Sequence, residues 1–290
     1  MQAEHIPNKN KSHSTVRIHT LSERYDAIKY LEIGVCTGDT FLNVDMPYKV
    51  AVDPNFQFEH QQYATDNIKF FPVTSDDFFN SLAENSLELP SIFKNNNDEK
   101  ITFDIIFIDG LHTFEQSFRD FENSLKYSHE NTIWIIDDTV PCDPYSAIPD
   151  MSFSLESRAQ ACISGKPWHG DVFKTVFAIH DKHPEFSYCT LMGANPQTVV
   201  WGAKKEERKP VFSSLEEINK LNYFDMLKHA ALLMPVTDDM LLDMAGLTIN
   251  PIQHGTSDTW KKLIYSQVTY LERKLINALL SENKKLRMTS

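Results

Sequence analysis

The segment TFDIIFID, residues 102–109, constrains the fold of this chain most strongly. Its apolar residues form a continuous run, as expected for a parallel strand covered on both faces, where alternation of apolar and polar residues is lost. The run ends in Asp109, and His112 follows three positions later. We therefore expect a buried strand to bring a carboxylate and an imidazole to one place, and the rest of the sequence must explain why.

Further strand-like runs alternate with helical segments on both sides of this run. The helix after Asp109 is indicated by a capping-box pattern at Thr113 and Gln116, followed by an apolar stripe at helical spacing. Strands are predicted at residues 30–33, 48–54, 68–73, 102–109, 131–137, 186–191 and 197–203. This order predicts an α/β fold, namely a doubly wound, Rossmann-like, mostly parallel seven-stranded sheet whose last two strands form a hairpin.

Acidic residues stand at the ends of several of these strands. In a doubly wound sheet, ligands bind beyond the carboxyl ends of the strands, where the strand order reverses. Glu32, Asp53, Asp109 and the pair Asp137 and Asp138 all occupy such positions. The sequence thus predicts an acidic ligand site at one edge of the sheet.

Three parts of the chain differ in character. We predict an N-terminal arm at residues 1–21, a main α/β domain at 22–203 and a helical C-terminal extension at 204–290. In the segment 258–286, apolar residues recur every three or four positions. This stripe is expected either to pack against the main domain or to form a homo-oligomer or partner interface.

Composition excludes several classes of function. The formal net charge of −12 disfavours nucleic acid as a partner. No apolar run approaches the ~18 residues of a membrane span, and the polar N-terminus lacks the apolar core of a secretion signal. The four cysteines show no paired spacing, which suits reduced thiols. We therefore expect a cytoplasmic protein without membrane or nucleic-acid partners.

The segment LEIGVCTGDT, residues 31–40, is a glycine-containing loop after the first strand, expected to turn into a short helix. Gly34 and Gly38 allow close approach of the backbone to a ligand and unusual dihedral angles. Glu32 would repel a pyrophosphate but would suit a ligand with a positively charged amino group. Asp53, at the end of the second strand, is placed to accept hydrogen bonds from ribose hydroxyls.

These residues, with Asp109, resemble the class I S-adenosylmethionine-dependent methyltransferases over residues 22–203. The resemblance implies that Glu32 and Gly34 border the methionine part of the cofactor, that Thr40 binds its carboxylate, and that Ser75 and Asp76 lie near adenine. The cofactor-binding set it implies is Glu32, Gly34, Gly38, Thr40, Asp53, Ser75, Asp76 and Asp109.

Asp109, Asp137 and Asp138 follow two strands that are neighbours in such a fold. Three carboxylates at adjacent strand ends would repel one another unless a cation neutralised them, and oxygen ligands favour hard ions such as Mg²⁺ or Mn²⁺. This arrangement resembles the metal-dependent O-methyltransferases, which include catechol O-methyltransferase and the sugar O-methyltransferases of macrolide and aminocoumarin pathways. In that group a catalytic base lies three residues after the first metal ligand, and His112 holds that position here. Its alternative role is a helix cap or a core hydrogen bond.

The predicted function is methyl transfer from S-adenosylmethionine to a hydroxyl of a small polyhydroxylated acceptor, such as a sugar or glycosylated metabolite, assisted by a divalent metal. One alternative is a metal-independent small-molecule methyltransferase. Another is a non-catalytic protein that binds an adenosyl ligand and engages a partner through its helical tail. The segment from Trp168 to Asp171 is expected either to line the acceptor pocket or, through Asp171, to cap the following helix.

Overall fold

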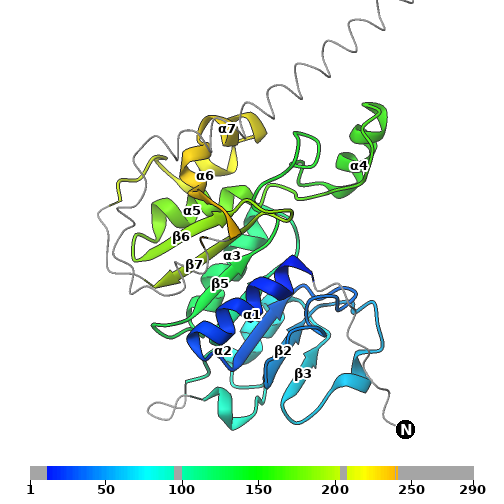
Figure 1. The fold of residues 1–290 in the computed structure, drawn as a ribbon, viewed down its shortest axis with the longest axis vertical. Coiled ribbons are helices and arrows are strands. Elements are labelled where there is room, and N and C mark those ends of the chain that lie inside the picture. Colours follow the sequence, from blue (N-terminus) through cyan, green and yellow to red (C-terminus); the bar gives the residue numbers. More distant parts are fainter. Residues whose placement is uncertain (1–11, 95–99, 203–207, 239, 241–290) are drawn as a thin grey trace, which may run out of the picture.

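The computed structural model describes residues 12–94, 100–202, 208–238 and 240, and these contain one eight-stranded sheet (Figure 1). The strand order is β3-β2-β1-β4-β5-β7-β6-β8. Strands β1 to β5 are parallel to one another, β7 is antiparallel to β5 and β6, and β8 is parallel to β6. The strands are β1 (Lys29–Ile33), β2 (Tyr48–Val52), β3 (Ile68–Phe71), β4 (Ile105–Ile108), β5 (Ile133–Ile136), β6 (Phe186–Leu191), β7 (Gln197–Gly202) and β8 (Pro235–Val236).

The predicted α/β class and mostly parallel sheet are confirmed, whereas the predicted count of seven strands is one too few. The additional strand, β8, has two residues and lies within the region predicted to be helical throughout. Its pairing with Thr190 and Leu191 at the sheet edge is tertiary, and two residues carry no strand periodicity that a sequence pattern could reveal.

Helices cover both faces of the sheet. The α-helices are α1 (His13–Tyr25), α2 (Ser75–Ala83), α3 (Phe114–Leu125), α4 (Met151–Gln160), α5 (Phe173–Lys182), α6 (Leu215–Asn219) and α7 (Tyr223–Lys228). The 3-10 helices are η1 (His60–Tyr63), η2 (Ser91–Phe93) and η3 (Ala230–Leu233). In Figure 1, α1 lies in front of the sheet, and α4 projects away from the body.

The boundary predicted for the N-terminal arm falls inside α1. This helix begins at His13, is capped by the Ser12 hydroxyl, and buries Ile18 and Leu21 completely or nearly so. The buried residues of this helix also include Ser14 and Arg17. Because both are polar, the hydropathy of the sequence does not indicate a buried helix here. Helix α1 packs against the sheet, with Ile18 and Leu21 in the same apolar layer as Tyr30 of β1. Residues 241–290, which carry the whole of the predicted helical stripe, lie outside the described residues.

Alternate residues of each central strand pack into two separate apolar layers. Leu31, Ile106 and Ile136 belong to the layer with α2, α3 and α5, while Tyr30 and Phe107 belong to the layer with α1. Both faces are thus buried, which explains the continuous apolar run of β4. Within the described residues, no helix has the length and apolar character needed to cross a membrane.

The strand order reverses between β1 and β4. From β1 the chain adds β2 and β3 on one side, and β4 and β5 on the other. The loops that follow β1 and β4 therefore diverge and leave a crevice beyond the carboxyl ends of these strands. This is where the strand-end acids lie.

Candidate active site

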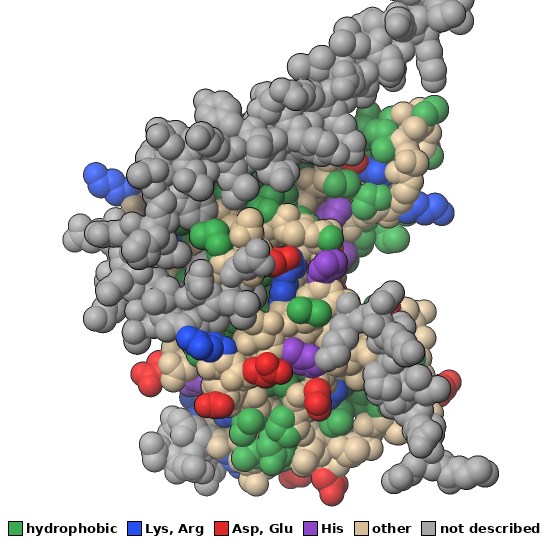
Figure 2. All heavy atoms as spheres, in the orientation of Figure 1, with side chains coloured by type: hydrophobic (Ala, Val, Ile, Leu, Met, Phe, Trp, Pro, Cys, Tyr) green, Lys and Arg blue, Asp and Glu red, His purple; other side chains and the backbone are tan. Residues whose placement is uncertain are grey.

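A cavity of about 770 Å³ lies beyond the carboxyl ends of β1, β2, β4 and β5. This volume is within the ~300–1,000 Å³ typical of small-molecule sites. His112 lines this cavity, and so does every residue predicted to bind the cofactor or the metal except Gly38. The predicted residues in its wall are Glu32, Gly34, Thr40, Asp53, Ser75, Asp76, Asp109, His112, Asp137 and Asp138. The face of the molecule drawn in Figure 2 displays both acidic and basic side chains.

Gly34 is required by the crossing of two loops. Its φ is +83°, and a Cβ atom built there would lie 1.9 Å from the backbone oxygen of Asp109. The amide of Asp109 donates to the carbonyl of Ile33 at 2.8 Å, so the two loops are joined at this point. Gly34 thus allows the loops after β1 and β4 to touch each other. The sequence had predicted only that it lets the backbone approach a ligand.

The glycine loop continues as hydrogen-bonded turns instead of the predicted short helix. Gly38 has a φ of +82°, and the amides of Leu42 and Val44 donate to the carbonyls of Gly38 and Thr40. Asp53 holds the loop from β2, because its Oδ2 accepts hydrogen bonds from the amides of Val35 and Cys36, both at 2.8 Å.

Asp53 Oδ1 accepts from the amide of Asn55 at 2.7 Å. A carboxylate has about four lone-pair positions, so three amide bonds leave capacity for a ligand hydroxyl. Asp53 therefore both fixes the loop and remains able to bind ribose. The sequence predicted only the ribose contact, which stays a prediction.

Glu32 is almost fully buried at the base of the cavity. Its Oε2 accepts a hydrogen bond from the Tyr30 hydroxyl at 2.5 Å. Burial raises the pKa of Glu32 well above its usual range, and the negative charge of Asp109 adds to the effect. Lys49, also buried, donates to the carbonyls of Phe41 and Val44 and so pins the turn after the glycine loop.

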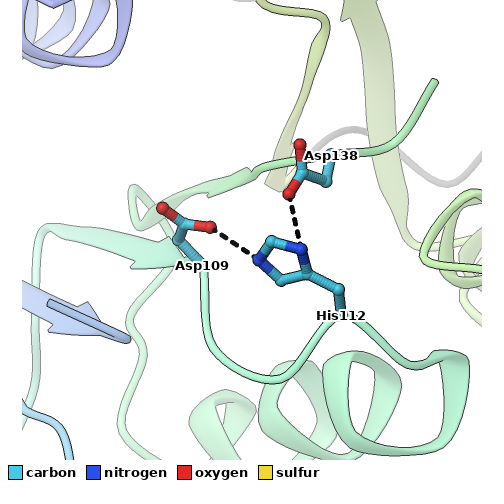
Figure 3. Close-up of side chains that lie close together, drawn as sticks. All are labelled: Asp109, His112 and Asp138. Atoms are coloured by element: carbon cyan, nitrogen blue, oxygen red, sulfur yellow. Dashed lines mark ion pairs between the residues drawn. The ribbon is translucent and has the colours of Figure 1, made fainter. Parts of the chain in front are cut away.

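Asp109, His112 and Asp138 form a compact cluster at another part of the cavity wall (Figure 3). The His112 ring lies between the two carboxylates, with Nε2 3.4 Å from Asp109 Oδ1 and Nδ1 2.9 Å from Asp138 Oδ2. One ligand atom from each of the three residues lies within 4.8 Å of the others. The φ of Asp138 is +57°, in the left-handed region, and such strain in a non-glycine residue is common at functional sites.

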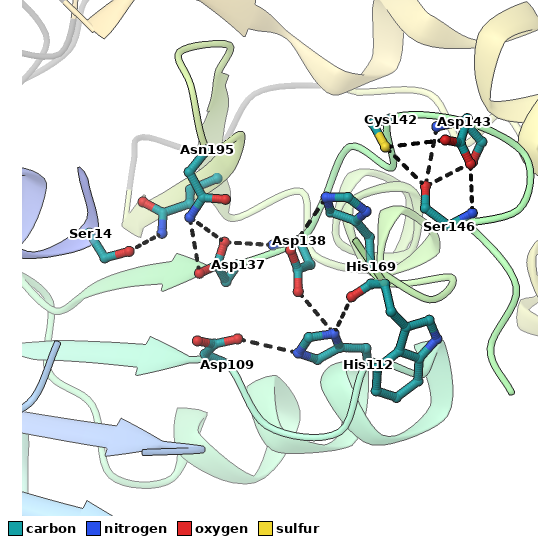
Figure 4. A network of polar contacts seen from close by, with 12 residues as sticks. Ser14, Asp109, His112, Asp137, Asp138, Cys142, Asp143, Ser146, His169 and Asn195 are labelled. Carbon is teal, nitrogen blue, oxygen red and sulfur yellow. Dashed lines mark hydrogen bonds and ion pairs between the residues drawn. The ribbon is translucent and has the colours of Figure 1, made fainter. Parts of the chain in front are cut away.

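Asp137 does not belong to this cluster, although the sequence grouped it with Asp109 and Asp138. Asn195, in the turn between β6 and β7, donates to its Oδ1 and Oδ2 at 3.1 and 3.3 Å (Figure 4). Asp138, whose φ is left-handed, faces His112, so the two adjacent carboxylates have different partners. Burial, together with repulsion from Asp109 and Asp138, raises the pKa of Asp137 well above its usual range.

The segment before α5 fixes His112. The ring stacks on Trp168 with centroids 4.8 Å apart, and Nδ1 lies 2.8 Å from the Trp168 carbonyl oxygen. A carbonyl only accepts, so Nδ1 carries a proton and donates. Gly170, with a φ of +59°, lets the segment touch His112, since a Cβ atom there would lie 1.6 Å from the His112 carbonyl oxygen. No sequence pattern signalled these contacts.

Burial alone would lower the pKa of His112, but its two carboxylate partners outweigh burial and raise the pKa to about 11. Burial raises the pKa of Asp109 to about 6, opposed by the hydrogen bond with His112. The Asp109 side chain is 32% exposed, so solvent in the cavity moderates the interaction. In this arrangement the cluster is an ion pair with the imidazole positively charged.

Asp171 caps a different helix from the one expected. Its Oδ1 accepts from the amide of Phe114, at the start of α3, at 2.7 Å, while its Oδ2 pairs with the buried Lys174 at 2.7 Å. The N-cap of α5 is Val172, which makes no side-chain cap. Asp171 therefore ties the start of α3, just after His112, to the start of α5.

Residues 31–139 match a family model described as a methyltransferase domain. Over these residues the chain is similar to a methyltransferase domain. This match confirms the predicted methyltransferase, and its limits enclose the glycine loop, Asp53 and the cluster of Asp109, His112 and Asp138. A search of curated protein sequences finds no match.

The methyltransferase domain is also similar to solved structures. An O-methyltransferase from Bacillus cereus in complex with S-adenosylhomocysteine is 15% identical, with 67% of this chain and 82% of that chain covered and a TM-score of 0.45. The S-adenosylhomocysteine-bound methyltransferase PaMTH1 from Podospora anserina is 15% identical, with coverage of 68% and 81% and a TM-score of 0.43. TomG from Streptomyces achromogenes, an O-methyltransferase of tomaymycin synthesis in complex with S-adenosylmethionine, is 12% identical, with coverage of 68% and 82% and a TM-score of 0.44.

The cluster fits a divalent cation on chemical grounds. Two carboxylates and an imidazole converge within the reach of one ion, and the carboxylates gain from a positive charge between them. The described residues already place the His112 imidazolium there. A bound cation and the second ring proton of His112 would therefore offset the same negative charge, that of Asp109 and Asp138. Either one can do so.

Proposed function

We propose that this methyltransferase transfers the methyl group of S-adenosylmethionine to a hydroxyl oxygen of a small polyhydroxylated acceptor, such as a sugar or glycosylated metabolite, with the help of Mg²⁺ or Mn²⁺. The observation that carries the proposal is the convergence of Asp109, His112 and Asp138 on the cavity that also contains the glycine loop.

The cofactor site is inferred from the part of the cavity formed by β1, β2 and β3. The loop after β1, held by Asp53, gives a fixed backbone surface for the methionine part, with Thr40 in the cavity wall. The remaining capacity of Asp53 suits ribose hydroxyls, and Ser75 and Asp76 at the start of α2 suit the base. Glu32, being buried and of raised pKa, shapes the base of this part.

The metal would be held by Asp109 and Asp138, with His112 beside it. A bound divalent cation would acidify the acceptor hydroxyl and stabilise the developing alkoxide. Asp137 is committed to Asn195 and is inferred to orient the loop after β5.

His112 is proposed to take the proton of the acceptor hydroxyl at Nε2. The Trp168 carbonyl keeps the other proton on Nδ1, so a neutral His112 has its free lone pair on Nε2, the nitrogen on the Asp109 side. The acceptor oxygen then forms a bond to the methyl carbon while the carbon–sulfur bond breaks, and the electron pair remains on sulfur as S-adenosylhomocysteine. The negative charges of Asp109 and Asp138 raise the pKa of His112 and so keep a second proton on its ring. His112 is therefore proposed to act as a base only when another positive charge, such as a bound cation, offsets these two carboxylates.

A metal-independent methyltransferase is the second candidate, and one observation favours it. His112 joins both carboxylates without any further group, so its positive charge already offsets part of their negative charge. In that case Asp109 and Asp138 would shape the pocket and His112 would orient the acceptor.

We further propose a cytoplasmic enzyme, since the four cysteines, at residues 36, 142, 162 and 189, are all unpaired. Nucleic acid and membranes are not among the proposed partners. The predicted homo-oligomer interface on the C-terminal helices lies largely outside the described residues and stays a prediction, as does the non-catalytic alternative.

A screen of hydroxylated metabolites for transfer of labelled methyl tests the proposal. Each acceptor is assayed with excess chelator and then with added Mg²⁺ or Mn²⁺. We expect product only with the metal, and the methyl group on oxygen. Full turnover in chelator would favour the metal-independent candidate, and no binding of S-adenosylmethionine would contradict methyl transfer altogether.

A further inference from the structure

Asp171 and Lys174 form a buried ion pair that the proposed chemistry does not use. Their side chains are 8% and 7% exposed, and Lys174 Nζ lies 2.7 Å from Asp171 Oδ2. Removing two charges from water is costly, and a buried pair often gives no net stability over apolar side chains of the same volume. The pair therefore calls for an explanation other than the stability of the core.

Asp171 holds the backbone immediately after His112. Its Oδ1 accepts a hydrogen bond at 2.7 Å from the amide of Phe114, the first residue of α3, which lies 57 positions earlier in the chain. The Thr113 hydroxyl already supplies the side-chain cap of α3, by accepting from the amide of Gln116. Asp171 thus adds a second anchor, from a distant segment, at the point where the chain leaves His112.

The segment that ends in Asp171 also holds the imidazole itself. Trp168 stacks on the His112 ring and accepts a hydrogen bond from its Nδ1, and Gly170 lets the segment touch the His112 backbone. Asp171 therefore sets the position of residues 168–171 relative to the start of α3. The surface on which the imidazole rests moves with that position.

Lys174 connects the ion pair to α6, which lies against α5 (Figure 1). Its Nζ also donates to the carbonyl of Asn219, the last residue of α6, at 2.7 Å. Asn219 Nδ2 in turn lies 3.4 Å from Glu115 Oε1, at the start of α3. The end of α6, in the region predicted to be a C-terminal extension, is thus bonded through Lys174 to the carboxylate that holds the backbone after His112.

We infer that Asp171 is a positioning residue for His112, held in place by Lys174 and, through it, by α6. The inference rests on the proposed role of His112 as the base. A base must lie within hydrogen-bond reach of the proton that it takes, so a small displacement of the ring lowers the rate of chemistry. Cofactor binding, which is assigned to the loops after β1 and β2, does not depend on that displacement.

Two double variants isolate the hydrogen bond to Phe114. Both carry Lys174→Met, which is close to lysine in shape and leaves no buried ammonium group without its partner. Asp171→Asn/Lys174→Met keeps an oxygen for the Phe114 amide, whereas Asp171→Ala/Lys174→Met removes it. Losing the ion pair and the contact with Asn219 is common to both variants, so it cancels in the comparison.

Fluorine NMR of protein labelled with fluorotryptophan reports the ring stack without any turnover. The Trp168 resonance, assigned with Trp168→Phe, should keep its wild-type position in Asp171→Asn/Lys174→Met. In Asp171→Ala/Lys174→Met it should shift toward its position in His112→Ala. Thermal unfolding checks each fold. If the alanine variant does not fold, Asp171→Ser/Lys174→Met replaces it with the same expected result, because the serine hydroxyl stops short of the Phe114 amide.

Kinetics then links the position of the ring to chemistry. Both double variants should bind S-adenosylhomocysteine as tightly as the wild-type protein, measured by calorimetry. The single-turnover rate is measured with the metabolite that the wild-type protein methylates in the screen described above. It should be about tenfold or more lower in Asp171→Ala/Lys174→Met than in Asp171→Asn/Lys174→Met.

A Trp168 resonance at the same position in both folded double variants would overturn the inference, as would equal single-turnover rates. Absence of methyl transfer by the wild-type protein, with the fluorine signals as expected, would instead overturn the proposed function. The dependence of the His112 ring on Asp171 would then stand by itself.

Discussion

Asn195 donates to both carboxylate oxygens of Asp137, whereas the adjacent Asp138 faces His112 across 2.9 Å. Two consecutive acids after one strand thus have separate partners. Asp138, with Asp109, supplies the charge of the cluster, and Asp137 links β5 to the turn between β6 and β7.

This division predicts different effects for two equivalent substitutions. Asp138→Asn should weaken Mn²⁺ binding about tenfold or more, because it removes one of two converging carboxylates. Asp137→Asn should weaken it less than about threefold, since Asp137 is bonded to Asn195. Titration of Mn²⁺ followed by electron paramagnetic resonance measures both. Equal losses would show that Asp137 also acts as a ligand, as the sequence alone suggested.

Substitution of His112 should separate chemistry from binding. His112→Ala is expected to lower the rate of methyl transfer by about 10²–10⁴-fold, the usual contribution of a positioned base, while S-adenosylhomocysteine binds with little change. Single-turnover kinetics, in which chemistry limits the rate, makes the comparison. His129→Gln is the control, because His129 pairs with Asp104 just before β4, at the opposite end of the sheet. An unchanged single-turnover rate in His112→Ala would return His112 to a structural role.

Gly34 should tolerate no side chain. Gly34→Ala combines a left-handed φ with a contact of 1.9 Å to the Asp109 backbone, so we expect a loss of about 2–4 kcal/mol in the free energy of unfolding and weaker cofactor binding. Gly165→Ala has a similar φ of +81°, but its Cβ would meet only Pro167 at 3.5 Å. It should cost about 1 kcal/mol. Denaturant unfolding of both variants tests this, and equal losses would show that the loop crossing is not the cause.

Asp120 should make stability depend on pH in a defined direction. Its folded-state pKa of about 6 lies above the ordinary value of 3.8, so the folded protein binds the proton more tightly and loses stability as pH rises from about 4 to 6. Asp120→Asn removes this dependence. We expect the variant to gain about 1–3 kcal/mol relative to wild type between pH 4 and pH 7, since one pKa unit corresponds to 1.36 kcal/mol. Denaturant unfolding of the ligand-free protein across this range measures the change, and a constant difference would contradict the assignment.

The sequence by itself determined the class of fold and the edge of the sheet at which the site lies. A short continuous apolar run such as residues 105–108, within a chain of alternating strands and helices, indicates a strand covered on both faces, and acids at the ends of parallel strands lie at one edge of the sheet. Local signals also determined α3, whose Thr113 cap accepts from the amide of Gln116 as predicted.

Tertiary structure alone decided which side chains meet. The sequence could not show that Asn195 binds Asp137, that Trp168 fixes His112, or that Asp171 caps α3, because each pair joins segments brought together only by the packed sheet and helices. The same holds for α1, whose buried polar residues resemble a surface arm until their partners are known. Hydropathy and spacing report how a residue relates to its own element. The partner of a buried polar group depends on the whole fold. Such a group has no access to water, so it must bond to a donor or acceptor that the fold brings next to it.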